Sequence, residues 1–388
     1  MSRILTALAA AALLAGCDSA NPFQIDVVPE DTTIEPVDPN DPNDPAVPGN
    51  RFAFDPERRL TMNSVNYDDN GTPADPTDDT VVINNLPFDG PDGVYDDVAG
   101  SFTTNADGQT TTIFQNRETT ISGEMQYYAV LVRSDYLEAT SAAGRNWGDF
   151  GFAGANVNRT TYAVPQTPES SYVYNGVYAA TRTYDDRGGI ELIRGDVTLL
   201  LDVQDLDPNF PGEGLQGTIV GSVTDRTRDT TADSLVGDLP DIELRSVSFN
   251  TVTGVWEDGS AATFNDDGTI RDTGEHSGMI AGPTGEEMGG YVIIEGAADV
   301  QTITYDVVNW ELVTPSGTQV GQTTGLSLND QDDLQALVNS GVLVGNLDVT
   351  MADLPTGAVI TGTGSDELDI ETEYDAREIG VFVTDIQP

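Results

Sequence analysis

Residues that could carry out catalysis are few in this 388-residue chain. It contains one histidine, His276, in the run DTGEHSG, and one cysteine, Cys17. A serine or cysteine triad needs a histidine base, and the neighbours of His276 predict a turn at a strand edge instead. Carboxylate pairs such as Glu286-Glu287 arise by chance among 65 acidic residues, so they do not indicate a glycosidase. We therefore expect a protein that is not an enzyme.

A second group of side chains has the chemistry of a calcium site. The stretch NYDDNGTPADPTDD places Asp68 and Asn70 at EF-loop-like spacing, and Asp75 could add an oxygen ligand from a folded-back turn. Position twelve of the loop is Thr77, where an EF-hand has a bidentate glutamate. Two interpretations stay open: a weak calcium site, and a solvated turn stabilised by Asn-Gly and Pro. No other cofactor is predicted.

Cys17 stands at the end of an N-terminal leader. Arg3 gives the positive charge, residues 4–14 form an apolar run, and LAGC at 14–17 resembles the bacterial lipobox, in which the cysteine is acylated and becomes the mature N-terminus. The run is shorter than the roughly 20 residues that span a bilayer. We expect a lipoprotein signal peptide over 1–16 and a lipid anchor on Cys17; the alternative is an ordinary secretory leader.

Charge and composition restrict the partners. The chain has 16 basic residues, all arginine, against 65 acidic residues, for a net charge of −49. Such a surface excludes ordinary binding to nucleic-acid phosphates, and it favours a basic protein partner over an anionic lipid surface. Residues 17–50 are dominated by Pro and Asp, which predicts a disordered acidic tether. A single cysteine leaves no disulfide within the chain.

Beyond the tether the pattern is that of β-strands. GDVTLLLDVQ alternates Val197, Leu199, Leu201 and Val203 with polar residues, as expected of a half-buried strand. Glycines recur inside strands such as GLQGTIVGSVT, which is typical of the bends in a barrel. The three tryptophans could pack in such a core, the alternative being a sugar-stacking surface.

Turn signals separate these strands. They predict tight connections at 186–189, 257–259 and 265–268. Short strands joined by tight turns pair antiparallel, so an antiparallel sheet is expected. One helix is predicted in NDQDDLQALVNSG at 329–341, within a late insert.

Several stretches together resemble a known family. The relevant stretches are YNGVY at 174–178, GDVTL at 195–199, LQGTI at 215–219, GMIAGPTGEEMGGYVIIEG at 278–296 and AREIGVFV at 376–383. They look like the opening strands, closing hairpin and last strand of the lipid-anchored barrel of transferrin-binding protein B and factor H-binding lipoproteins. Ile280 and Ala281 stand where that family usually has Phe-Tyr. The resemblance implies a β-barrel at the outer membrane of a Gram-negative bacterium, and it transfers no binding residue.

The expected architecture is therefore all-β. A barrel of about eight antiparallel strands should be closed by Glu378–Thr384 pairing with an early strand, which removes exposed edges. The expected segments are a signal peptide at 1–16, a disordered tether at 17–50, an N-terminal β subdomain at 51–164, and the barrel at 165–388 with an insert near 300–370.

Two functions fit this architecture. The first is a lipid-anchored, surface-exposed cell-envelope protein that recognises a protein or small solute through loops at one end of the barrel. The loops 205–214 and 226–239 are long for hairpin connections, and Phe210 between two prolines is the candidate anchor, unless it packs down on the barrel mouth. The alternative is a structural envelope lipoprotein with no soluble ligand.

Overall fold

A computed structural model describes the chain between residues 49 and 387. Cys17, Phe210, the predicted helix at 329–341 and the predicted tether up to residue 48 lie outside the described residues, whereas the last two residues predicted for the tether, Gly49 and Asn50, belong to a strand. The chain divides into a larger body, which runs to Ala298 and resumes at Tyr374, and an insert, Asp299–Glu373. Within the 49–387 range the description omits residues 73–74, 91–92, 118–124, 145–148, 164–169, 186–187, 206–214, 230–238, 252, 298–300, 315–316, 325–358 and 373.

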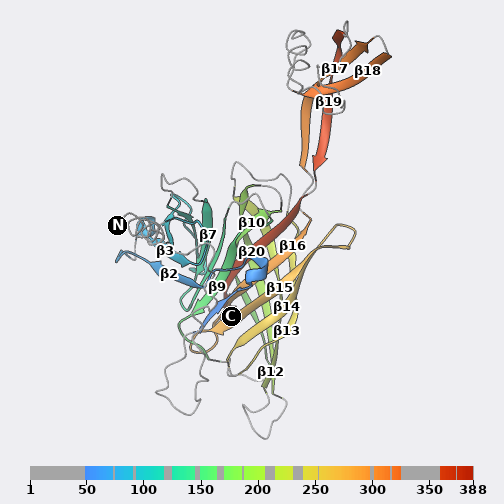
Figure 1. Cartoon of the computed structure of the whole chain (residues 1–388). Helices are drawn as coiled ribbons and strands as arrows, with labels where there is room; N and C mark the ends of the chain where they lie inside the picture. The colour runs from blue at the N-terminus through green and yellow to red at the C-terminus, as the bar shows by residue number, and fades with distance from the viewer. Residues whose placement is uncertain are drawn as a thin grey trace, which may run out of the picture. The chain divides into compact units, whose positions relative to one another are not determined.

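Eight strands of the larger body form a closed antiparallel barrel (Figure 1). The last of them, β20, pairs with β10 on one side and with β16 on the other, so the predicted closing strand is confirmed. The all-β class and the eight-stranded barrel are likewise confirmed. The strands are β10 (Ser170–Tyr184), β11 (Ile190–Asp205), β12 (Leu215–Asp229), β13 (Ile242–Ser248), β14 (Val255–Phe264), β15 (Ile270–Ala281), β16 (Glu287–Ala297) and β20 (Asp375–Ile386).

The barrel is apolar inside and polar on its free outer face. Leu199 and Leu201 of β11 point inward and are fully buried in a core that also contains Trp256, so the predicted core position holds for that tryptophan. Thr198, next to Leu199, and Thr218 of the neighbouring strand β12 are exposed. In the described part of the chain, none of the helices is long and apolar enough for a membrane crossing.

One predicted turn is present and another is wrong. At 265–268 the chain turns as expected, with Gly268 at φ +80° and the Asn265 N–H donating to the Thr269 carbonyl at 2.9 Å. Glu257–Gly259, by contrast, forms a β-bulge inside β14, where the register with β15 shifts. A side chain at Gly259 would overlap the ring of His276, so the glycine lets the strand continue past that ring. The signal at 186–189 lies partly outside the described residues.

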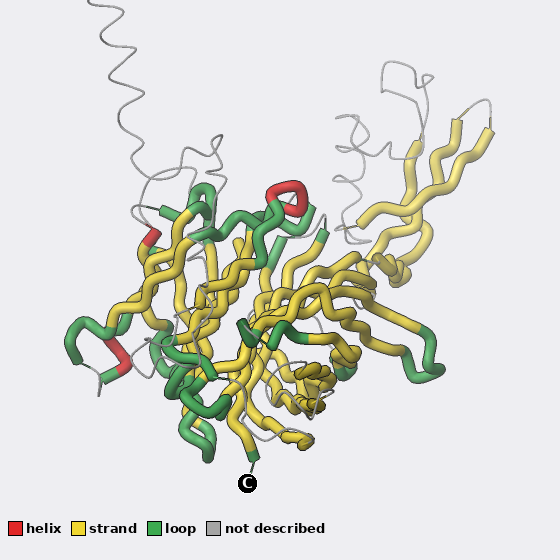
Figure 2. Tube along the Cα trace, turned by 90° about the horizontal axis from the view of Figure 1, so that it is seen from below, coloured by secondary structure: helices red, strands yellow, loops and turns green. Residues whose placement is uncertain are grey.

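A second sheet of nine strands lies beside the barrel. Its order is β1-β9-β8-β7-β6-β4-β3-β2, with β5 paired to β6, and the helical elements among its described residues are short 3-10 turns (Figure 2). The sheet is curled. Arg133 of β7 stacks on the Tyr67 ring, 3.9 Å from its centroid, although Tyr67 lies on the edge strand β2 and three strands separate β7 from β2 in the sheet order. The elements are β1 (Gly49–Phe52), η1 (Pro56–Arg58), β2 (Ser64–Asp68), η2 (Pro76–Asp78), β3 (Thr80–Asn84), β4 (Val94–Asp97), β5 (Thr103–Thr104), β6 (Thr110–Asn116), β7 (Tyr127–Arg133), β8 (Leu137–Gly144) and β9 (Ala153–Arg159).

The two sheets share an apolar interface. Ile379 and Val381 of β20 point out of the barrel and are buried against Val130 and Ala139 of the curled sheet. Arginines join the edges of the same interface: Arg58 of η1 pairs with Glu275 at 2.7 Å and with Glu295 at 3.0 Å. Burial of apolar side chains supplies most of the stability of such an interface, and the partly exposed ion pairs add little to that stability.

The insert forms a separate three-stranded antiparallel sheet. Its strands are β17 (Gln301–Thr314), β18 (Gly317–Thr324) and β19 (Val359–Thr372), in the order β18-β17-β19. The central strand β17 therefore pairs on both sides.

Candidate functional site

The barrel has two chemically different ends. Because consecutive strands are antiparallel, the connections β10–β11, β12–β13 and β14–β15 lie at one end, where the chain also leaves for the insert after β16 and returns into β20. We call this the insert end. The chain enters at the opposite end: Gly49 pairs with Arg159, whose guanidinium donates to the carbonyls of Thr253 and Ile280, both at 2.7 Å. We call this the entry end.

This alternation corrects the predicted recognition site. The connection after β11 (206–214, with Phe210) belongs to the entry end, whereas the connection after β12 (230–238) belongs to the insert end. The prediction that both long loops serve one end of the barrel is therefore wrong, because two connections that flank a single strand must lie at its opposite ends. Both central stretches lie outside the described residues.

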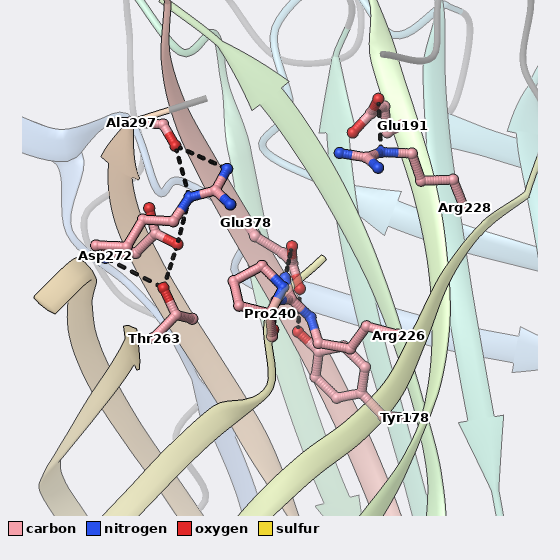
Figure 3. A network of polar contacts seen from close by, with 10 residues as sticks. Tyr178, Glu191, Arg226, Arg228, Pro240, Thr263, Asp272, Ala297 and Glu378 are labelled. Carbon is pink, nitrogen blue, oxygen red and sulfur yellow. Dashed lines mark hydrogen bonds and ion pairs between the residues drawn. The ribbon is translucent and has the colours of Figure 1, made fainter. Parts of the chain in front are cut away.

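A buried ionic network fills the insert end of the barrel (Figure 3). The Glu378 carboxylate accepts a hydrogen bond from the Tyr178 hydroxyl at 2.7 Å and pairs with the Arg226 guanidinium. Arg226 also donates to the Pro240 carbonyl, where the chain re-enters β13. Burial opposes the charge on Arg226, but the adjacent Glu378 raises its pKa above the ordinary value. Burial, together with the same carboxylate, raises the pKa of Tyr178 well above its ordinary value.

Further polar pairs extend the network around the barrel wall. Arg228 of β12 pairs with the fully buried Glu191 of β11 at 3.1 Å. The Thr263 hydroxyl of β14 donates to Asp272 of β15 at 2.5 Å. Arg271 donates to the Ala297 carbonyl at 3.3 Å, at the last residue of β16 before the insert. The network therefore fixes the strand ends from which the insert departs.

The network also corrects the role predicted for the start of the 226–239 loop. Arg226 and Arg228 belong to β12 and point into the barrel, with guanidiniums that are 1% and 8% exposed. They are therefore committed to carboxylates inside the fold rather than to a ligand. Chemically the arrangement neutralises buried charge and holds strands in register, which is a structural task.

His276 does not lie in a strand-edge turn as predicted. It is fully buried in the middle of β15, where its Nδ1 accepts from the Trp256 indole N–H at 3.1 Å and its Nε2 donates to the Arg245 carbonyl at 3.0 Å. Burial lowers the pKa of His276, so the ring stays neutral. The alternation of side chains along the strand could have predicted this burial, because His276 lies on the same face as Gly278 and the core residue Ile280.

The calcium candidates lie in a turn between β2 and β3. Asp68 accepts from the Asn70 backbone N–H at 2.9 Å, and Asp75 caps η2 by accepting from the Thr77 N–H at 3.2 Å and the Thr77 hydroxyl at 2.7 Å. The Asn70 amide donates to the Asp78 carbonyl. In the described ranges no group of three or more His, Cys, Asp or Glu side chains could hold a metal ion. The contacts of Asp68, Asn70 and Asp75 stabilise the turn itself.

An exposed aromatic at the insert end was missed by the sequence analysis. Phe88, in NLPFDG between β3 and β4, is 46% exposed at φ +66°, a region that non-glycine residues rarely adopt. Its carbonyl accepts from the Met125 N–H at 2.8 Å, just before β7 begins. β7 runs from there to the entry end, so Phe88 lies at the opposite end. The sequence signal was an aromatic directly after proline, within turn residues.

A buried carboxylate joins the two sheets at the entry end. Glu287, the first residue of β16, accepts from the Ser134 hydroxyl at 2.6 Å and from the backbone N–H groups of Asp135 at 3.1 Å and Tyr136 at 3.0 Å. It is paired across the strands with Asp385. Burial raises the pKa of Glu287 to about 7.

This raised pKa predicts a pH-dependent stability. A carboxyl whose pKa is higher in the folded than in the unfolded state destabilises the fold at high pH, and the loss is recovered as the pH falls through 7 toward 4.5. Between pH 8 and pH 5, wild type should gain about 2 kcal/mol more unfolding free energy than Glu287→Gln, measured by urea denaturation. Glu286→Gln is the control, because the pKa of Glu286 is lowered. Equal pH dependence in wild type and Glu287→Gln would refute this assignment.

Comparison with known proteins gives no identity. No protein-family model matches the chain, and no curated protein matches it.

Proposed function

We propose that the chain is a lipid-anchored cell-envelope protein that holds the insert end of its barrel toward a protein partner. The observation that supports this most directly is that the larger body has two different ends. The described chain enters at Gly49, at the entry end, while the strand ends to which the insert is connected and the exposed Phe88 lie at the other end of the larger body. A tether on the membrane side would leave the insert end farthest along the body from the anchor.

The polar outer face of the barrel supports attachment by lipid. Exposed Thr198 and Thr218 suit water rather than acyl chains, so membrane binding should depend on Cys17. The resemblance to transferrin-binding protein B and factor H-binding lipoproteins supports an outer-membrane location in a Gram-negative bacterium. The partner is expected to be a basic protein, because of the net charge of −49; a small-solute ligand is the narrower alternative.

One observation favours a purely structural role instead. The interior of the insert end is occupied by Tyr178, Arg226 and Glu378, each of them buried. A barrel of eight strands is just wide enough for its own side chains, so a filled interior suits a rigid spacer. In that case the protein would have no soluble ligand.

Cys17→Ser is expected to move the protein from the membrane fraction to the soluble fraction. The acyl chains contribute roughly 0.8 kcal/mol per buried CH₂, and nothing else predicted in the chain replaces them. Fractionation with a high-salt wash measures the change, and Ser19→Ala is the matched control next to the lipobox. Sedimentation of Cys17→Ser with membranes after the wash would contradict a single lipid anchor.

A pull-down with the full chain tests the binding function. Immobilised wild-type protein should retain a stoichiometric partner from extracellular fluid, and Phe88→Ser should retain several-fold less, since exposed aromatics are common interface anchors. Phe102→Ser is the control, because Phe102 is similarly exposed (39%) on another loop. Recovery of envelope neighbours alone would favour the structural role.

A further inference from the structure

The described part of the insert is a sheet with two edge strands, β18 and β19, of different character. Among the described residues, β18 and β19 each pair with β17 and with no other strand. An edge strand presents a row of unpaired N–H and C=O groups, and proteins normally protect such a row with charges, proline or a bulge. The two edges of the insert differ in these protections.

Among the described residues, the strand β19 carries features that protect an edge and the strand β18 does not. β19 has four acidic residues in its sequence VITGTGSDELDIET, and its register with β17 shifts between Asn309 and Trp310. β18, with the sequence GTQVGQTT, has no charged residue and no proline. Its pairing with β17 continues without a shift from Gly317 to Thr324. β18 is thus a regular edge of eight residues that can template a further strand.

The charge of the insert selects the kind of strand that could add. Residues 299–373 contain 13 Asp and Glu residues and no Lys, Arg or His. A second copy of the same edge would bring 13 further negative charges against these, which disfavours self-pairing. An extended segment rich in Lys or Arg would instead be attracted.

We propose that the β18 edge binds an extended, basic segment of a partner protein as a fourth antiparallel or parallel strand of the insert sheet. Main-chain hydrogen bonds to β18 supply the affinity, as in other strand-addition complexes, and the acidic insert selects the positive charge. The inference rests on the proposed binding function and names the surface and the partner chemistry.

Hydrogen exchange on the full chain tests this proposal. The probe is an eight-residue peptide of alternating Arg and Val; the controls are the same peptide with alternate amides N-methylated and a Glu-Val peptide. The Arg-Val peptide should slow exchange of the outward-facing amides within 317–324, those that do not bond to β17, by about tenfold or more, and neither control should do so. Equal protection by all three peptides, or no protection, would overturn the proposal.

Proline substitutions locate the edge. Successive N–H groups of a strand point to opposite sides, so of Gln319→Pro and Val320→Pro one removes an outward donor and the other breaks pairing with β17. The variant that loses the outward donor should keep slow exchange of the β17 amides, but the peptide should no longer protect its β18 amides. If the outward-facing amides of 317–324, which do not bond to β17, are already slow in wild type without peptide, another segment of this chain covers the edge and the proposal fails; if their protection rises with protein concentration, a second copy covers the edge and the proposal fails as well.

The proposed function can fail separately. Cys17→Ser fractionation and the Phe88→Ser pull-down do not involve β18, so their failure would leave a strand-binding insert on a protein with another role.

Discussion

Glu378→Ala is expected to lower the free energy of unfolding by about 3 to 5 kcal/mol, the range typical for removing one partner of a buried ion pair. The substitution would leave the Arg226 guanidinium, 1% exposed, without a counter-charge. It would also remove the acceptor of the Tyr178 hydroxyl. Two polar groups inside the barrel would then lack their partner, and each costs its own desolvation.

Urea denaturation followed by tryptophan fluorescence measures this loss, because Trp256 lies in the barrel core. Glu243→Ala is the matched control. Glu243 pairs with Arg245 at 3.4 Å on the outside of the barrel, with both side chains about half exposed, and its loss should change stability by no more than about 0.5 kcal/mol. Glu378→Met combined with Arg226→Met should recover much of the loss, since no unpaired charge remains. Similar stability of Glu378→Ala and Glu243→Ala would show that the network is not closed as described.

Truncation after Asp375 is expected to abolish cooperative unfolding of the larger body. Without β20, the barrel opens between β10 and β16, and both strands gain an unpaired edge. The same truncation removes Ile379, Val381 and Val383, which are buried against the curled sheet. Loss of both a barrel wall and a sheet interface exceeds the few kcal/mol by which most domains are stable.

Thermal unfolding monitored by circular dichroism measures this effect. Removal of Gln387 and Pro388 is the control, since both follow β20 in the chain and their removal takes away a single described backbone hydrogen bond to the barrel, from the Gln387 N–H to the Val173 carbonyl. A truncated chain with an unchanged melting transition would contradict the role of β20 as the closing strand.

The barrel was predictable because its strands alternate. Leu199 and Leu201 point inward while Thr198 points to solvent, a period of two that is visible in the sequence. The closing strand was identified by resemblance rather than by periodicity. Its own sequence offered a further signal, because Ile379, Val381 and Phe382 occupy both faces, and a strand that is apolar on both faces is covered on both.

The polar interior was not predictable in the same way. Arg226 and Arg228 read as part of a solvated loop, because charged side chains seldom enter a barrel. Their carboxylate partners, Glu378 and Glu191, are 152 and 37 residues away in the chain, so no local pattern reveals the pairs. The bulge at Gly259 and the burial of His276 are one feature, which appears only when β14 and β15 are aligned.

The pairing of β20 has a consequence for export. β20 closes the barrel against β10, about 200 residues earlier in the chain, with the whole insert between β16 and β20. Contacts this distant in sequence form slowly, and an unclosed barrel leaves two strand edges available for wrong pairing. A chain delivered through a membrane from its N-terminal side therefore stays unable to complete its barrel until β20 has emerged. In a chain that is secreted as proposed, this delay would keep the polypeptide unfolded while it passes through the membrane.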